Sequence, residues 1–129
     1  MLTLRLNSSS GVPPYLQLAQ QIRQALLAGV LVPGDQLPTV KEVVGQLAVN
    51  PNTVFKSYRE LEREGLVQGR PGAGTFVLRR PAGPPPGAHA KLTRSLGKWV
   101  ASAREAGMDD LSIEAMVRSM LDATDEAIA

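Results

Sequence analysis

Hydrophobic residues recur at helical spacing in three stretches of the first half of the chain. The first stretch predicts a helix over residues 14–29. Its apolar face consists of Tyr15, Leu18, Ile22 and Leu26. A short helix over about residues 40–47 and a longer one over about residues 51–64 are predicted next. The longer helix has an apolar stripe at positions i, i+4 and i+7, formed by Val54, Tyr58 and Leu61. Residues 2–6 alternate between apolar and polar side chains, which predicts a short edge strand.

The second and third predicted helices both carry start signals. Thr39 and Glu42 have the spacing of a capping box, in which each side chain bonds the backbone N–H of the other residue. Asn50 is a suitable N-cap for the third helix, and Pro51 falls at its first position, where no backbone N–H is needed. Gly65 is expected to end that helix in a left-handed conformation.

The polar residues of the third predicted helix form a second face. At i, i+4, i+7 and i+11 this face carries Asn52, Lys56, Arg59 and Arg63. Asparagine can pair with adenine in the major groove of DNA, and lysine or arginine can pair with guanine. A short helix, a tight turn and a helix with this face predict a helix-turn-helix that reads DNA. Three glutamates on the flanks leave an ordinary solvated helix face open as an alternative.

A β-hairpin is predicted directly after the third helix. Residues 66–68 are a short apolar run, residues 69–74 are a glycine-rich turn and residues 75–78 are β-prone. The hairpin has Arg70 at its tip, and its glycines, Gly72 among them, would let the backbone approach a phosphate or the minor groove. A hairpin in this place is the wing of a winged helix-turn-helix.

Four segments in this order resemble a known family: PPYLQLAQQI, PGDQLPTVKEV, VNPNTVFKSYRELEREGLV and GRPGAGTFV. Residues 14–78 resemble the DNA-binding domain of the GntR family of bacterial transcription regulators. The resemblance implies a winged helix that binds an operator as a homodimer. It also implies that Lys41 contacts a DNA phosphate, with a plain solvated lysine as the alternative.

The chain departs from the family pattern on the reading helix. Some branches have arginines where this chain has Pro51 and Phe55, so those arginine contacts are not transferred. Phe55 either contacts a thymine methyl group or folds back onto the core, and we expect the second. The residues expected to bind DNA are Lys41, Asn50, Asn52, Thr53, Lys56, Arg59, Arg63, Arg70 and Gly72.

A proline- and glycine-rich boundary separates the DNA-binding half from a helical tail. We expect a DNA-binding domain over residues 1–80, a semi-stiff linker over residues 81–87 and a tail over residues 88–129. Arg79 and Arg80 either touch DNA phosphate or simply keep the linker soluble, and we expect the second.

The tail pattern predicts two amphipathic helices, of which the second is capped by Asp110 or Ser112. Two short helices bury too little surface to be stable alone, so a second copy is the expected partner. The expected dimerisation residues are Leu92, Leu96, Trp99, Val100, Ile113, Met116, Val117, Met120 and Leu121. A small-molecule effector pocket lined by tryptophan and methionines remains an alternative. The short tail resembles the YtrA-type branch of the family, whose tail serves dimerisation.

Charge and composition narrow the function. Residues 1–80 carry nine Lys/Arg against five Asp/Glu, whereas residues 81–129 carry five against seven, so the basic half is the half with the DNA-reading pattern. The chain has no cysteine and a single histidine, His89, and we expect no metal, no cofactor and no enzymatic activity. No stretch has the roughly 20 apolar residues of a membrane span, and a cytoplasmic location is expected.

These observations predict a mainly α-helical fold with a small β-hairpin wing and a C-terminal two-helix dimerisation hairpin. The expected function is that of a transcription regulator, most simply a repressor, that binds a pseudo-palindromic operator on double-stranded DNA as a homodimer. The alternative is a winged-helix protein-interaction module that uses the helical tail for docking.

Overall fold

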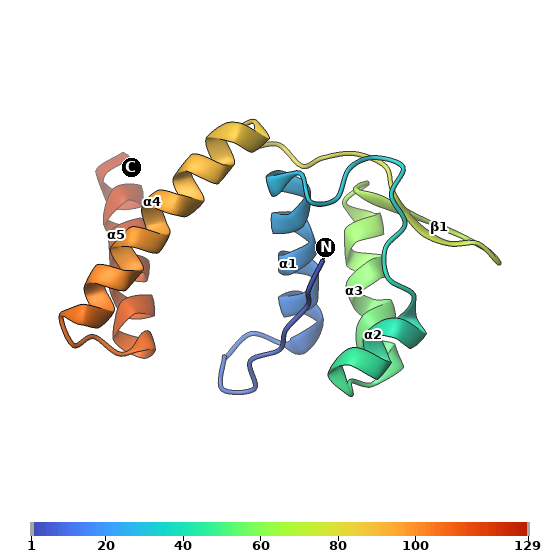
Figure 1. The fold of residues 1–129 in the computed structure, drawn as a ribbon, viewed down its shortest axis with the longest axis horizontal. Helices are drawn as coiled ribbons and strands as arrows, with labels where there is room; N and C mark the ends of the chain where they lie inside the picture. The colour runs from blue at the N-terminus through green and yellow to red at the C-terminus, as the bar shows by residue number, and fades with distance from the viewer. Residues whose placement is uncertain (1, 129) are drawn as a thin grey trace. The chain divides into compact units, whose positions relative to one another are not determined.

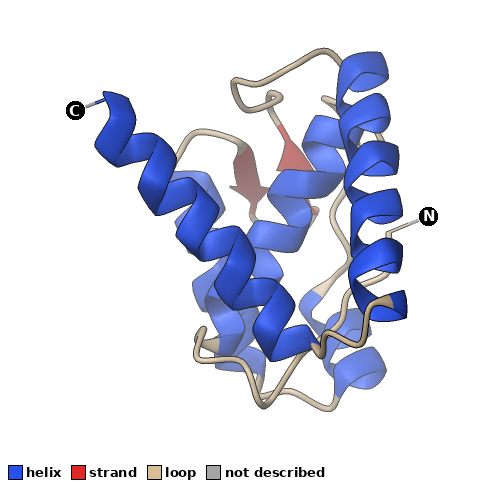
Figure 2. Cartoon of the chain, turned by 90° about the vertical axis from the view of Figure 1, so that its left-hand side faces the viewer, coloured by secondary structure: helices blue, strands red, loops and turns tan. Residues whose placement is uncertain are grey.

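The computed structural model describes residues 2–128, and their side chains up to residue 123. The elements are α1 (Pro14–Ala28), α2 (Val40–Leu47), α3 (Pro51–Arg63), β1 (Val67–Arg70), β2 (Gly74–Val77), α4 (Pro86–Glu105) and α5 (Asp110–Ile128) (Figure 1). Helices dominate, and the two strands form one short antiparallel hairpin (Figure 2). The chain divides into two compact units, residues 1–89 and residues 90–129. The predicted fold class is confirmed.

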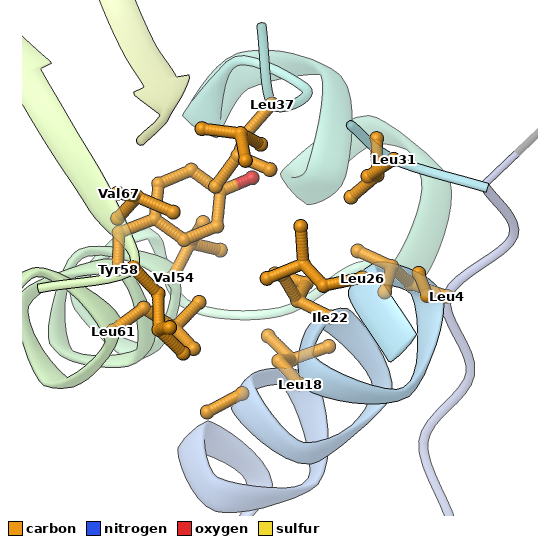
Figure 3. Close-up of a cluster of buried hydrophobic side chains, with 14 of the residues drawn as sticks. Leu4, Leu18, Ile22, Leu26, Leu31, Leu37, Val54, Tyr58, Leu61 and Val67 are labelled. Atoms are coloured by element: carbon orange, nitrogen blue, oxygen red, sulfur yellow. The ribbon is translucent and has the colours of Figure 1, made fainter. Parts of the chain in front are cut away.

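The core of the first unit lies between α1 and α3, where their apolar stripes meet (Figure 3). Leu18, Ile22 and Leu26 come from α1, and all three are fully buried. The predicted stripe of α3 is buried as well, and its Tyr58 hydroxyl donates a hydrogen bond of 2.6 Å to the carbonyl of Pro38. Burial raises the pKa of Tyr58, with the nearby Glu42 carboxylate adding to the effect. The helical periodicity therefore identified the core correctly.

The helix caps form as predicted. The Thr39 hydroxyl accepts from the Glu42 N–H, and the Glu42 carboxylate accepts from the Thr39 N–H, both at 3.1 Å. The Asn50 side chain accepts from the N–H of Asn52 at 2.8 Å. Gly65 follows α3 with φ +77°, the left-handed conformation that glycine adopts without strain. Ala48, which the sequence did not single out, adopts φ +54° in the turn between α2 and α3.

The wing is anchored by the loop that precedes α2. Its strands pair with Val67 opposite Val77 and Arg70 opposite Gly74, so the turn is shorter than the expected residues 69–74. Backbone bonds of 2.8 Å join Val77 N–H to Asp35 and Leu37 N–H to Thr75. The loop thereby acts as a third, irregular strand beside β2.

The expected strand at residues 2–6 is wrong. The amide side chain of Gln21 on α1 accepts from the N–H of Arg5 at 2.8 Å and donates to its carbonyl at 2.6 Å. Gln17 binds both backbone groups of Asn7 in the same way. Two glutamines of a helix therefore supply the hydrogen bonds that a neighbouring strand would provide.

Arg79 and Arg80 were expected only to keep the linker soluble, and that expectation is wrong. The Arg79 guanidinium donates to the carbonyls of Glu64 and Gly65 at the end of α3. Arg80 donates to Leu27 O near the end of α1, at 2.7 Å, and also to Pro84 O. Each arginine therefore satisfies carbonyls that a helix terminus leaves without partners.

The tail unit is built from α4 and α5. Helix α4 begins at Pro86, two residues before the expected start of the tail. Asp109, and not the expected Asp110 or Ser112, caps α5 by accepting from the Ser112 N–H at 2.8 Å, a hydrogen bond that lowers the Asp109 pKa. Arg104 and Asp110 form an ion pair of 3.0 Å across the connection. None of the helices in the described part of the chain has the length and hydrophobicity that crossing a membrane requires.

Candidate nucleic-acid interface

The exposed face of α3 carries the hydrogen-bond donors that the sequence predicted. Asn52, Lys56 and Arg59 are exposed and Thr53 is half-buried, while the opposite face of the helix enters the core. The Lys56 ammonium lies 4.1 Å from the centre of the Tyr15 ring at the start of α1. A cation over an aromatic face is held by the ring quadrupole, so Tyr15 restrains Lys56 while its charge stays at the surface.

The positive charges near α3 divide into paired and unpaired groups. Arg63 binds Glu60 one turn earlier on α3, which raises the Arg63 pKa and lowers that of Glu60. Arg23 of α1 pairs with Glu64 at 2.6 Å. Among the described side chains, no ion pair involves the remaining cations of this region, which are Lys41, Lys56, Arg59 and Arg70. Of the expected cations, only Arg63 is therefore neutralised by a carboxylate.

One carboxylate of α3 adds a direct hydrogen bond to the wing. Glu62 of α3 accepts from the N–H of Gly69 in β1 at 2.6 Å. Arg70 ends β1, and its guanidinium lies 4.6 Å from the centre of the Phe76 ring across the hairpin. Gly72 occupies the turn with φ +74°. The arginine thus stacks on the wing strand, and in the turn only Gly72 presents backbone without a side chain.

A groove of about 620 Å³ separates α3 from the wing. It is lined by α3 residues, the wing turn and the start of α2, namely Pro38, Thr39, Val40, Phe55, Tyr58, Arg59, Glu62, Gly69, Arg70, Pro71, Gly72, Ala73, Gly74 and Thr75. The groove therefore joins the three elements in which the sequence placed DNA contacts. Lys41 is exposed and directly follows Val40, so it lies at the α2 end of this region.

Phe55 corrects an expectation. The ring was expected to fold back onto the core, but it is 49% exposed and lines the groove. The stripe that enters the core consists of Val54, Ser57, Tyr58 and Leu61. Phe55 lies outside that stripe because a helix turns by about 100° per residue.

Several contacting residues were not identified from the sequence. Tyr15 and Phe76 hold cations, and Glu62 ties the wing to the helix. Tyr15 lies 41 positions from Lys56, so periodicity within one helix cannot reveal the pair. The Arg70–Phe76 contact was accessible in principle, because the two residues lie on paired strands of one predicted hairpin. Asn50, expected at the interface, uses its side-chain oxygen to cap α3.

The arrangement of α2, a tight turn, α3 and an antiparallel hairpin defines a winged helix-turn-helix protein. Residues 14–77 match the model of one such family, described as bacterial regulatory proteins, gntR family. The chain belongs to the GntR family.

Individual relatives agree with this assignment. Over 74 residues the chain is 42% identical to the HTH-type transcriptional repressor YtrA of Bacillus subtilis (strain 168), a match that covers 57% of this chain and 57% of the relative. The chain thus spans little more than half the length of that relative.

Solved structures with similar folds also include GntR-family members. YtrA from Sulfolobus acidocaldarius, a GntR-family transcription factor, aligns with a TM-score of 0.54 at 28% identity, covering 76% of this chain and 97% of that chain. AraR(DBD) in complex with operator ORX1 aligns with a TM-score of 0.53 at 28% identity, covering 59% of this chain and 95% of that chain.

Proposed function

We propose that this protein is a sequence-specific DNA-binding transcription regulator that represses by occupying an operator. The observation that carries the proposal is the set of donors on α3 that form no ion pair with any described residue, placed across a groove from a glycine-bearing wing. Helix α3 enters the major groove, where Asn52, Thr53, Lys56 and Arg59 read base edges or adjacent phosphates. Lys41, Arg70 and the backbone at Gly72 hold the phosphate backbone. Arg63 contributes less because Glu60 neutralises it.

The tail forms the contact between the two subunits of the dimer. Its exposed apolar side chains line a groove of about 300 Å³, formed by Leu96, Trp99, Met116, Val117, Met120 and Leu121. A second copy of the tail covers these side chains and places two reading helices about one DNA turn, or roughly 34–36 Å, apart. Ile113 is already buried in the single chain, so it supports the hairpin. In this proposal residues 1–80 bind DNA, residues 81–87 connect and residues 88–129 dimerise.

The relatives support this function by their own descriptions. One is a transcriptional repressor, and one structural neighbour is in complex with an operator. A regulator of this kind acts in the cytoplasm, where the chromosome of a bacterium lies, and needs no catalytic activity. A small molecule that enters the tail groove would act as an effector by changing the dimer.

The test is selection of bound fragments from a random DNA pool at about 150 mM salt, followed by sequencing. Enrichment of an inverted repeat, with half-sites about one helical turn apart, is the expected result. Affinity for that site should fall steeply between about 50 and 200 mM salt, because phosphate contacts release counterions. Failure to enrich any sequence, together with salt-insensitive binding to a protein partner, would overturn the proposal in favour of a protein-interaction module.

A further inference from the structure

Phe55 is a large apolar side chain on the same side of α3 as the polar donors. From the helical turn of about 100° per residue, Phe55 lies about 40° around the axis from Arg59 and about 60° from Asn52. The core cluster does not include it, and half of its surface faces solvent. The exposed half of the ring gains nothing for the stability of the single chain, since that apolar surface remains in water.

The surroundings of Phe55 direct it toward a ligand in the groove. The ring lines the groove opposite the wing turn, which is formed by Pro71, Gly72 and Ala73. The wing's own aromatic residue, Phe76, is already stacked against Arg70. The charged residues of α3 that line the groove with Phe55 are Arg59 and Glu62, and Glu62 is bonded to Gly69. Phe55 is therefore the apolar part of a reading face whose other members donate hydrogen bonds.

The major groove of DNA offers one apolar feature to such a ring. Guanine, cytosine and adenine present only hydrogen-bond donors and acceptors there, whereas thymine also presents its C5 methyl group. We propose that Phe55 is a specificity-determining residue that contacts this methyl group, so that each half-site contains a required thymine beside the base read by Asn52 or Arg59. This inference rests on the proposed function, because it needs α3 to lie in the major groove.

The competing explanation is that Phe55 only spaces the wing from α3. A spacer would affect binding to every sequence equally, because it would act through the position of the wing. A methyl reader affects binding only when the methyl group is present. Deoxyuridine separates these explanations, since it keeps the pairing edge and the O4 acceptor of thymine and lacks only the methyl group.

The experiment starts from the half-site selected with the whole 129-residue chain. Each thymine is replaced in turn by deoxyuridine, and the ratio of affinities for the two operators is measured for wild type, Phe55→Ala and Phe55→Leu. For one thymine per half-site, we expect wild type to bind the deoxyuridine operator about fourfold more weakly, the factor for losing one methyl group's burial. Replacement in both half-sites should cost roughly fifteenfold. Low salt keeps weak variants measurable.

Phe55→Ala should bind the thymine and deoxyuridine operators equally, and Phe55→Leu should retain part of the preference. Val32→Ala is the matched control, because Val32 is 47% exposed and lies outside the reading helix and the groove. This control should keep the full preference. An identical thymine preference in wild type and Phe55→Ala, or none in wild type, would overturn the inference while leaving the selected operator, and so the proposed function, intact. Failure to select any half-site would overturn both.

Discussion

The two units of this protein bury their hydrophobic residues to very different extents. In residues 1–89, side chains from α1, α2, α3, the wing and the N-terminal segment form one closed core. In the tail, only Ala103 and Ile113 are buried among the hydrophobic side chains that the structure describes. Leu92, Leu96, Met116, Met120 and Leu121 of the tail are all exposed. A helical pattern alone therefore does not say whether an apolar face is covered within its own chain.

This difference indicates which unit depends on a partner for its stability. The first unit has the core, the caps and the anchored wing that an independent fold needs. The tail presents a contiguous apolar groove, which is unusual for a surface that stays in water. We expect the stability of the first unit to be independent of protein concentration and that of the tail to rise with it.

The largest expected effect comes from the core of the first unit. Leu61→Ala should reduce the free energy of unfolding by about 2–5 kcal/mol, because Leu61 is fully buried between α3 and the other elements. Chemical denaturation followed by circular dichroism measures the loss, which should be the same at low and high protein concentration. A loss that disappears at high concentration would show that dimerisation stabilises this core as well.

The next largest effect is expected in the tail. Leu96→Asp places a charge in the exposed apolar groove, and should weaken self-association at least about a hundredfold if a second copy covers that groove. Sedimentation equilibrium measures the dissociation constant. The matched control is Ala101→Asp, which puts the same charge on an exposed position of α4 nearly opposite Leu96. Equal dissociation constants for the two variants would refute the tail dimer.

The same contrast explains what could be predicted from the sequence. A helix cap joins residues that are close in sequence, so Thr39, Glu42 and Asn50 predicted the starts of α2 and α3 correctly. The core stripes were also predictable, because one helix period fixes which side chains share a face. For the candidate site, this periodicity identified the exposed donors of α3, whereas the partners of those donors come from other elements.

Two predictions from the sequence failed because they involve interactions between distant parts of the chain. Residues 2–6 alternate like a strand, but Gln21, 16 positions after Arg5, supplies the backbone bonds instead. Arg80 reaches Leu27 across 53 positions, which no linker composition indicates. Phe55 was misplaced for a different reason: its hydrophobic character favoured the core, although its position on the helix places it outside the buried stripe and beside the groove.

The pH dependence of the unfolding free energy distinguishes a cap in the first unit from a cap in the tail. Bonds from Thr39 lower the Glu42 pKa from its ordinary 4.5, so unfolded Glu42 binds a proton more readily than folded Glu42. The stabilisation is present above pH 4.5 and is lost as the pH falls through the folded value. Glu42→Gln should be less stable than wild type at neutral pH, and the difference should shrink below pH 4.5.

Thr39→Ala and an equivalent tail variant sharpen this comparison. Thr39→Ala should cost about 1 kcal/mol of unfolding free energy, the usual value for an N-cap. The pKa of Asp109, the cap of α5, is also lowered. Asp109→Asn removes the charge of this cap and should leave the unfolding of the first unit unchanged. Urea denaturation at pH 3, 4, 5 and 7 measures the unfolding free energy of Glu42→Gln, Thr39→Ala and Asp109→Asn. A pH-independent difference between Glu42→Gln and wild type would contradict the capping explanation.

An effect no larger than that of the Thr39 cap is expected at Ser57, where the change is a gain in stability. Its side chain is fully buried on the core face of α3, and its hydroxyl has no hydrogen-bond partner among the described residues. A buried hydroxyl without a partner loses its hydration and gains nothing in return, and serine is also a weaker helix former than alanine. Ser57→Ala should therefore raise the unfolding free energy by about 1 kcal/mol, with operator affinity unchanged because the residue faces away from the groove. Thermal denaturation at several protein concentrations measures the gain, which belongs to the first unit only if it is independent of concentration. A loss of stability would mean that the hydroxyl forms a bond in the folded core.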